Sequence, residues 1–276
     1  FNLDNVRAGL KSAFGRDDLS LVPRLDQATR VLSLDSDFLG LDPAGGNAAL
    51  GFSAKRRPDR LGDDGEWVPR SMDEMSRLYV VEPAFTVTGS MADHRLRLPA
   101  SQVARVAAAV AQQLGVDGVT AEIDARVSAW VKPAVEDLQA AAGTALVLAG
   151  AQQPADVHAL VAAINEKLGA FGKTISVLKN TSRAFGDLSD LREAVNSGAV
   201  TTIISTTPAD PVYDGPNDFR WGEIVEKTTY VQVGFNRNHT AMLADWHVPG
   251  THFLEEWGDV RAADGTYSES TSGWYL

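Results

Sequence analysis

The feature that most constrains the fold of this chain is the alternation of short apolar and amphipathic segments in its second half. Four apolar runs have the length of buried strands, at residues 144–149, 174–178, 200–205 and 228–233. Helical patterns separate them, at residues 155–168, 188–196 and 217–226, and Asp187 stands at the N-cap position of the second helix. Apolar strands that alternate with helices are typical of a parallel sheet covered on both faces. The sequence therefore predicts an α/β fold.

The first half is less regular, but it also combines helices and strands. The patterns predict helices over residues 3–14, 44–57, 100–114 and 125–142, strands over 30–34 and 77–81, and a long surface loop over 58–76. We expect two Rossmann-like lobes with mostly parallel sheets, over residues 1–142 and 143–276. The second lobe is expected to end in a wrapping segment around residues 244–259, which has no clear period.

The composition excludes several classes of function. The 276 residues include 25 Lys and Arg against 36 Asp and Glu, which gives a net charge of −11. This balance argues against a protein that binds nucleic acid or anionic membranes without specificity, because both need clustered basic side chains. The chain has no cysteine, which excludes thiolate-held metal and iron–sulfur sites in this segment. No apolar run approaches the roughly 20 residues that a membrane-spanning helix needs.

Two motifs that could indicate a ligand fail in their context. Gly172-Lys173-Thr174 resembles the end of a phosphate-binding loop, but it leads from a helix into a strand, whereas such a loop leads from a strand into a helix. We interpret it as a helix-ending turn. His247 and His252 lie five residues apart across a Pro-Gly turn, a spacing that does not bring three or four ligands to one metal ion. We therefore predict no metal site.

Acidic residues follow two of the predicted strands in the first half. Asp35 and Asp37 come after the strand at 30–34, and Glu82 follows the strand at 77–81. Ligands of open α/β sheets bind in the crevice beyond the carboxyl ends of the strands. An acidic side chain there can accept hydrogen bonds from the ribose or base of a nucleotide. Acidic residues are equally common as helix caps and turn residues, and the sequence leaves both interpretations open.

Several segments together resemble a known group of proteins. They are Leu34-Asp-Ser-Asp-Phe-Leu39, Tyr79-Val-Val-Glu-Pro83, Thr88-Gly-Ser-Met-Ala-Asp-His94, Asp210-Pro-Val-Tyr-Asp-Gly-Pro216, and Ala244-Asp-Trp-His-Val-Pro249 followed by Glu256-Trp-Gly-Asp259. The chain resembles the molybdopterin-oxidoreductase superfamily. Within it, the chain is most similar to the molybdopterin-oxidoreductase-like half of the B subunit of alternative complex III, a quinol-oxidising respiratory assembly. The resemblance covers nearly the whole chain.

The resemblance implies a site for the guanine end of a molybdopterin cofactor. Catalytic members combine an acidic residue and Pro at a strand end with an Ala-Asp pair and a Pro-Gly-Thr-Asp turn. Glu82-Pro83 and Ala92-Asp93 match this pattern, but the turn reads Pro99-Ala-Ser-Gln102. A methyl group at the Gly position blocks close backbone approach, and an amide cannot accept the guanine N–H pair as a carboxylate does. We therefore expect no catalytic residue and a vestigial cofactor site formed by Glu82, Asp93, Gly150, Gln152 and Ser205.

On this resemblance, the chain is expected to be a cofactor-less scaffold within an oxidoreductase complex. It would dock other subunits of a membrane-bound, quinol-oxidising respiratory complex on the periplasmic side. The chain would be a segment of a longer exported subunit, whose C-terminal half holds iron–sulfur clusters. One alternative is a domain of a catalytic oxidoreductase that binds molybdopterin guanine dinucleotide. Another is a small-molecule-binding module with a closed pocket lined by Glu82, Gly150 and Ser205.

Overall fold

The computed structural model describes residues 3–42, 45–179, 187–207, 209–252, 255–262 and 265–270. The chain divides into two compact units. Unit 1 consists of Phe1–Thr181 with Ala263–Gly265, and unit 2 consists of Ser182–Ala262 with Thr266–Leu276. The predicted boundary after residue 142 is wrong, because strand β7 (Ala145–Ala149) pairs with β2 (Arg30–Leu34) in the sheet of unit 1.

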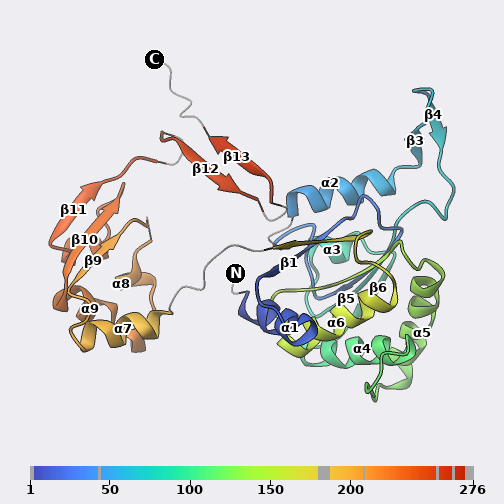
Figure 1. The fold of residues 1–276 in the computed structure, drawn as a ribbon, viewed down its shortest axis with the longest axis horizontal. Coiled ribbons are helices and arrows are strands. Elements are labelled where there is room, and N and C mark those ends of the chain that lie inside the picture. The colour runs from blue at the N-terminus through green and yellow to red at the C-terminus, as the bar shows by residue number, and fades with distance from the viewer. Residues whose placement is uncertain are drawn as a thin grey trace. The chain divides into compact units, whose positions relative to one another are not determined.

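A parallel sheet of four strands, in the order β6-β5-β2-β7, forms the centre of unit 1 (Figure 1). Strand β5 covers Arg77–Glu82 and β6 covers His94–Arg97, and all three pairings are parallel. Every residue of β2 is buried, as are five of the six residues of β5. Such burial on both faces explains why these strands appear in the sequence as continuous apolar runs rather than as alternating patterns.

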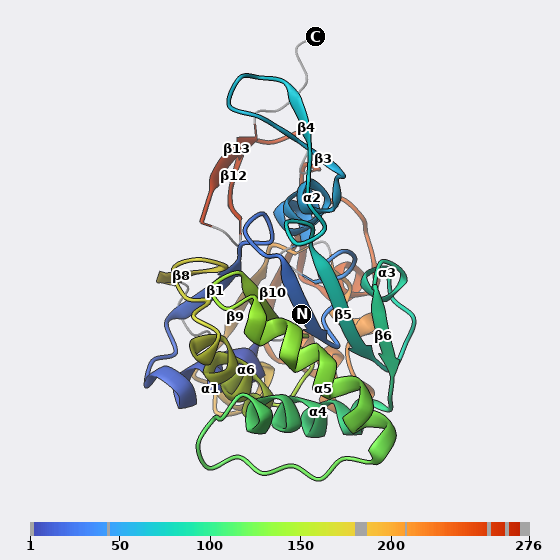
Figure 2. The same ribbon diagram turned by 90° about the vertical axis from the view of Figure 1, so that its right-hand side faces the viewer.

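Helices cover both faces of this sheet (Figure 2). The helices of unit 1 are α1 (Asp4–Phe14), α2 (Gly45–Arg56), α3 (Val87–Ser90), α4 (Ala100–Gln113), α5 (Ala125–Ala140) and α6 (Ala155–Lys167). One face, which includes Leu32 and Tyr79, packs against the valine and alanine side chains of α4, α5 and α6. The other face, which includes Val31 and Leu78, packs against Phe52 of α2. Two apolar layers therefore enclose the sheet.

Among the described residues, three strand pairings lie outside the parallel sheets. Strand β8 (Ile175–Lys179) was predicted to join the parallel sheet, but it pairs antiparallel with β1 (Leu19–Pro23). The predicted surface loop contains a short hairpin of β3 (Asp59–Leu61) and β4 (Trp67–Pro69). Farther along, β12 (Gly258–Arg261) pairs antiparallel with β13 (Tyr267–Ser270). Helix α6 (Ala155–Lys167) ends before Gly169, whose φ is +64°, and Gly172, with φ of +76°, lies in the next turn, which leads into β8. The motif therefore leads into a strand as predicted, but it follows the turn that ends the helix.

Unit 2 is built on a smaller parallel sheet in the order β11-β10-β9. Its elements are α7 (Leu188–Asn196), β9 (Thr202–Ser205), α8 (Pro211–Asp214), the 3-10 helix η1 (Asn217–Phe219), α9 (Trp221–Lys227), β10 (Thr229–Gly234), α10 (His239–Leu243) and β11 (Trp246–Pro249). Asp187 caps α7 as predicted, in a capping box with Asp190. The segment expected to wrap the lobe without regular structure instead contributes β11 and the start of β12.

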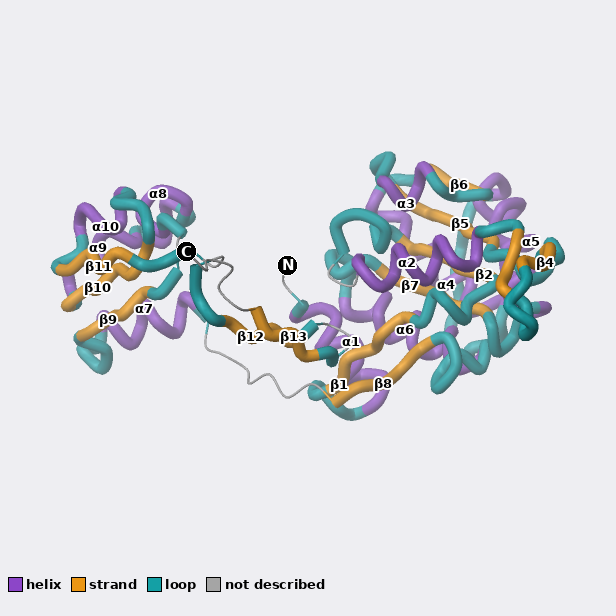
Figure 3. The backbone as a smooth tube through the Cα atoms, turned by 90° about the horizontal axis from the view of Figure 1, so that it is seen from above, coloured by secondary structure: helices purple, strands orange, loops and turns teal. Residues whose placement is uncertain are grey.

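The predicted fold class is confirmed, since each unit is an α/β body with a parallel sheet. Figure 3 shows that each unit combines helices and strands. Within the described ranges, no helix combines the length and apolar character that crossing a membrane requires.

Candidate functional site

The carboxyl end of β2 lies where the strand order of unit 1 reverses, because β5 flanks β2 on one side and β7 on the other. Such a switch point is the usual ligand crevice of an open α/β sheet. Gly150, directly after β7, donates its backbone N–H to the carbonyl oxygen of Leu34 at 3.1 Å. A Cβ atom at Gly150 would collide with the carbonyl oxygen of Asp35. The two strand ends therefore meet in direct backbone contact.

Two glutamines that follow β7 close the crevice further. Gln152 Nε2 donates to the carbonyl oxygen of Asp35 at 2.6 Å, and Gln153 Nε2 donates to its carboxylate at 2.7 Å. Gln153 is only 4% exposed. Asp35 itself has φ of 57°, in the left-handed region that aspartate tolerates better than most residues. The polar groups that could bind a ligand at this switch point are therefore bonded to one another.

Several carboxylates lie beside this crevice, and their different surroundings shift their pKa values in different directions. Burial raises the pKa of Asp35, and the nearby charge of Glu82 raises it further. Burial also raises the pKa of Asp42, which accepts a short hydrogen bond from Ser36. Burial opposes ionisation of Asp37 as well, but hydrogen bonds from Thr88 outweigh it and lower the pKa. This end of the sheet therefore concentrates acidic rather than basic groups.

Glu82, at the end of β5, is fully used within the chain. Its side chain is 2% exposed, and it pairs with Arg95 Nε at 2.5 Å. Thr86 Oγ1 donates a second hydrogen bond to the carboxylate at 2.6 Å. Gly89 has no side chain where the carboxylate lies, and a Cβ atom there would collide with it. Glu82 therefore serves to hold the β5–α3 corner together.

The structure brings only part of the predicted site together. Glu82, Gly150 and Gln152 lie at the carboxyl end of the unit 1 sheet. Asp93 lies at the opposite end of β5, where its carboxylate accepts the backbone N–H of Leu78 at 2.8 Å. Ser205 is the last residue of β9, in unit 2. The predicted pocket of Glu82, Gly150 and Ser205 is therefore not formed within either unit.

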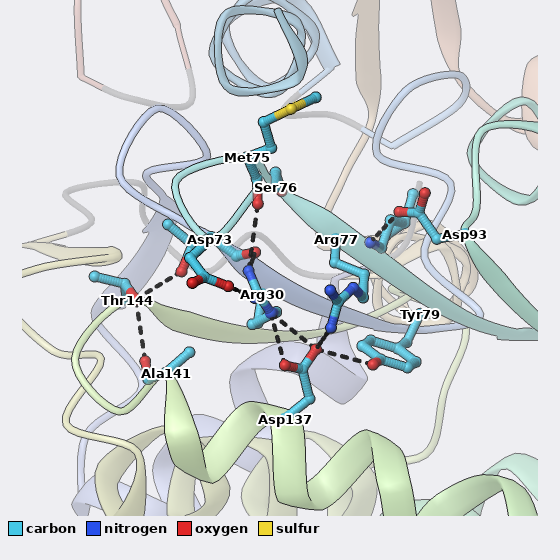
Figure 4. Close-up of polar contacts among 12 residues, drawn as sticks. Arg30, Asp73, Met75, Ser76, Arg77, Tyr79, Asp93, Asp137, Ala141 and Thr144 are labelled. Carbon is cyan, nitrogen blue, oxygen red and sulfur yellow. Dashed lines mark hydrogen bonds and ion pairs between the residues drawn. The ribbon is translucent and has the colours of Figure 1, made fainter. Parts of the chain in front are cut away.

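The amino end of the same sheet carries an ion-pair cluster that the sequence analysis missed (Figure 4). Asp137 of α5 accepts hydrogen bonds from Arg30 Nε at 2.8 Å, Arg77 Nη1 at 2.8 Å and Tyr79 Oη at 2.9 Å. Burial opposes ionisation of Asp137, but the hydrogen bond from Arg30 and its neighbours outweigh it and lower the pKa. Because the cluster joins a helix to two strands at the end away from the crevice, we interpret it as structural.

The chain contains a repeated corner, in which a threonine at the start of a short helix (α3 or α10) donates to an aspartate after the preceding strand of the sheet. In unit 1, Thr88 donates its backbone N–H and its hydroxyl to Asp37 at 2.9 and 2.8 Å. In unit 2, Thr240 donates the same two groups to Asp210 at 2.9 and 2.7 Å. Burial opposes ionisation of Asp210, but these hydrogen bonds outweigh it and hold its pKa at about 2.

The register of the strands repeats together with this corner. Asp93 accepts the backbone N–H of Leu78, and Asp245 accepts that of Tyr230, both at 2.8 Å. The side chains of Thr86 and Asn238 cap α3 and α10 in the same way. Residues 77–97 and residues 229–249 therefore have equivalent roles at equivalent positions. The sequence signal is the similarity of Thr88-Gly-Ser-Met-Ala-Asp93 to Thr240-Ala-Met-Leu-Ala-Asp245, two segments that the sequence analysis did not compare.

The comparisons with known proteins show the fold of the chain. No protein-family profile matches it, and no curated protein matches its sequence. A chain in the crystal structure of the formyltransferase/hydrolase complex (FhcABCD) from Methylorubrum extorquens, in complex with methylofuran, is similar over 98% of this chain and 76% of its own length, with a TM-score of 0.53 and 11% identity. At that identity, only the fold is shown. The predicted resemblance to alternative complex III within the molybdopterin-oxidoreductase superfamily is wrong, since the similar chain belongs to this other complex.

The residues at the switch point of unit 1 do not fit molybdopterin guanine dinucleotide. The phosphates of a dinucleotide need cationic side chains or helix N-termini, whereas this crevice presents Asp35, Asp37, Asp42 and Glu82. Of the two arginines of β6 at this end of the sheet, Arg95 is already paired with Glu82 and Arg97 is exposed. Residues 100–102, which stand where the pattern places the guanine-binding turn, form the first turn of α4. Across the described ranges, no three His, Asp or Glu side chains are grouped so that they could hold a metal ion.

Proposed function

We propose that this chain is a non-catalytic scaffold that docks other subunits of a multi-subunit complex. The closed crevice at the switch point carries the proposal. Gln152 and Gln153 take the positions of a ligand against Asp35, and Glu82 is neutralised by Arg95. A carboxylate that is committed to internal partners is not available to bind a substrate or to transfer a proton to it.

The similar chain from Methylorubrum extorquens belongs to a complex of several subunits, which supports a docking role without identifying the partners. The expectations of quinol oxidation, of iron–sulfur clusters in a further segment and of the periplasmic side all depended on the resemblance that is now corrected. They stay predictions, and the scaffold proposal does not require them.

The proposal is tested on protein purified from its native host under mild conditions. Light scattering measures the mass of the assembly, and pterin fluorescence after acid oxidation measures the cofactor content. We expect an assembly well above the mass of its single denatured polypeptide and no stoichiometric pterin on it. A monomeric protein, or about one pterin per chain, would contradict the proposal.

A titration of the purified chain tests the crevice itself. Guanosine diphosphate serves as the probe, because it carries the base and the phosphates that a dinucleotide site must recognise. We expect a dissociation constant weaker than about 1 mM by calorimetry, which corresponds to less than about 4 kcal/mol of binding free energy. A micromolar dissociation constant would show that the glutamines and carboxylates leave room for a nucleotide, and the proposal would fail.

A further inference from the structure

Unit 2 exposes a sheet face whose counterpart in unit 1 is mostly buried. We call it the outer face, and it consists of Ile204, Val231, Val233, Trp246 and Val248. Their side chains point the same way because the parallel register places Val231 opposite both Ile204 and Trp246, and Val233 opposite Val248. Ile204 is 66% exposed, Trp246 67% and Val248 44%. A contiguous apolar patch of this kind marks an interaction site more often than a free surface.

The repeated corner identifies the matching face of unit 1. The row of Ile204, Val231 and Trp246 corresponds to the row of Leu32, Tyr79 and His94, which has the same register. Likewise, Val248 corresponds to Leu96. In unit 1, Leu32 is 0% exposed and Leu96 is 4% exposed. The positions of Ile204 and Val248 are therefore open in unit 2 and buried in unit 1, whereas His94, which corresponds to Trp246, is itself exposed.

Helices make this difference. In unit 1, α4 begins at Ala100, shortly after β6 ends, and it packs its valines against this face. Helix α5 adds Trp130, whose ring meets the ring of Tyr79 edge-on, with 5.8 Å between centroids. In unit 2, the described residues after β11 lead instead to the β12–β13 hairpin. The opposite face of unit 2 is covered by buried side chains of α9, as its counterpart is by α2.

We propose that the outer face of unit 2 is the docking site of an amphipathic helix from another subunit. This inference deepens the proposed scaffold function and rests on it. The bound helix would present small and branched aliphatic side chains at i, i+3, i+4 and i+7, because α4 covers the matching face with Val103, Val106, Ala107 and Val110.

Charge and burial favour a different subunit over a second copy of this chain. Between residues 182 and 262 the sequence has twelve acidic and six basic side chains. Two such acidic units repel each other, whereas a helix flanked by Lys and Arg is attracted. The α4 helix of a second copy is not free to bind, since Val103 and Val110 are 0% exposed on their own sheet. The docked helix is therefore expected to be basic at its margins.

A photo-crosslinking experiment tests the inference in the native host. A photoreactive amino acid replaces Ile204 in one variant and Leu188 in a control variant. Leu188 is also exposed, at 51%, but it lies on α7, which contacts α9, the helix on the opposite face of the sheet. Mass spectrometry then identifies the crosslinked peptides. We expect position 204, but not position 188, to crosslink to a segment of another subunit with an apolar helical pattern.

A second pair of variants measures the contribution of the face. Ile204→Glu should weaken the association of the complex at least tenfold, because it buries a charge in an apolar contact, and Leu188→Glu should leave it unchanged. Both variants should keep the melting temperature of the free chain, since both side chains are largely exposed. Equal crosslinking at the two positions, crosslinks from position 204 to this chain or to a second copy, or no effect of Ile204→Glu would each overturn the inference. If the wild-type chain forms a complex and one of these results is found, the docking site alone is refuted. If the wild-type chain forms no complex, the scaffold function is refuted as well.

Discussion

Replacing Asp137 with alanine should destabilise unit 1 strongly, because the carboxylate is shared by three donors. The substitution removes the carboxylate that the guanidinium of Arg30, whose side chain is 7% exposed, contacts at 2.8 Å. It leaves the longer ion pair with Asp73, at 3.8 Å, whose side chain is 97% exposed. Removing one partner of a buried ion pair costs about 3–5 kcal/mol. Asp137 keeps 18% of its side-chain surface exposed and Arg77 keeps 36%, so water can replace part of the interaction. We therefore expect the lower end of that range, about 3 kcal/mol.

The effect is large enough to measure by thermal unfolding. For a domain of this size, each kcal/mol shifts the melting temperature by about 2–4 °C, so Asp137→Ala should lower it by about 6–12 °C. Circular dichroism at pH 7 follows the transition. The matched control is Asp18→Ala, because Asp18 also pairs with an arginine, Arg16, but the two side chains are 35% and 53% exposed and therefore more accessible to water than Asp137 and Arg30. Exposed pairs contribute little to stability, so the control should unfold close to the wild type. Equal melting temperatures for the two variants would refute the reasoning.

The pH dependence checks the cause of the effect. The pKa of Asp137 is lowered in the folded protein, so its contribution is fully present above the ordinary aspartate pKa of 3.8. The contribution is lost as the pH falls from that value through the lower folded pKa. Asp137→Asn should remove this acid-dependent loss while it keeps the volume of the side chain. If wild type and Asp137→Asn lose stability in parallel below pH 3.8, ion pairing is not what holds α5 to the strands.

Two further predictions concern the crevice. Gly150→Ala should lower the free energy of unfolding by about 1–3 kcal/mol, because the new methyl group overpacks against the Asp35 backbone. The control is Gly222→Ala on α9, where the nearest atom to the new Cβ is 4.0 Å away, so this substitution should be neutral or stabilising. Urea unfolding compares the two variants, and equal effects would contradict the close contact at Gly150. Burial raises the pKa of Asp42. The stability linked to protonation of Asp42 is therefore present below pH 3.8 and is lost as the pH rises through the raised pKa. Asp42→Asn should become more stable relative to the wild type as the pH rises through this range, and a difference in stability that does not depend on pH would contradict the prediction.

Local patterns in the sequence predicted most elements, and they could not predict which strands pair. The strands at 30–34 and 77–81 were found because they are buried on both faces and continuously apolar. Their partner β7 was assigned to the wrong lobe, because its pairing with β2 joins residues more than a hundred positions apart. Strands β11 and β12 were missed because their side chains are largely exposed and lack the buried apolar run.

The position of the candidate site could be predicted from the sequence, but whether its crevice is open or closed could not. Asp35 and Glu82 were chosen because acidic residues at strand ends commonly bind ligands, and the structure places both at the carboxyl ends of β2 and β5. Their partners were not predictable, because Gln153 reaches Asp35 across 118 positions of sequence. Arg95, which neutralises Glu82, lies on the next strand of the sheet. Whether such a crevice is open or closed depends on these tertiary contacts, which leave no periodic signal.

The repeated corner also explains why the resemblance to a cofactor-binding family misled. Asp37 and Asp210 lie in two of the segments that carried the resemblance, and both accept hydrogen bonds from a threonine in the following corner. Asp93 and Asp245 belong to two others, and both satisfy the backbone N–H of a buried strand. A buried N–H without a partner is costly in any Rossmann-like unit, so residues of this kind recur wherever the corner does. They are required by the fold in both units, and they are therefore no evidence for a nucleotide.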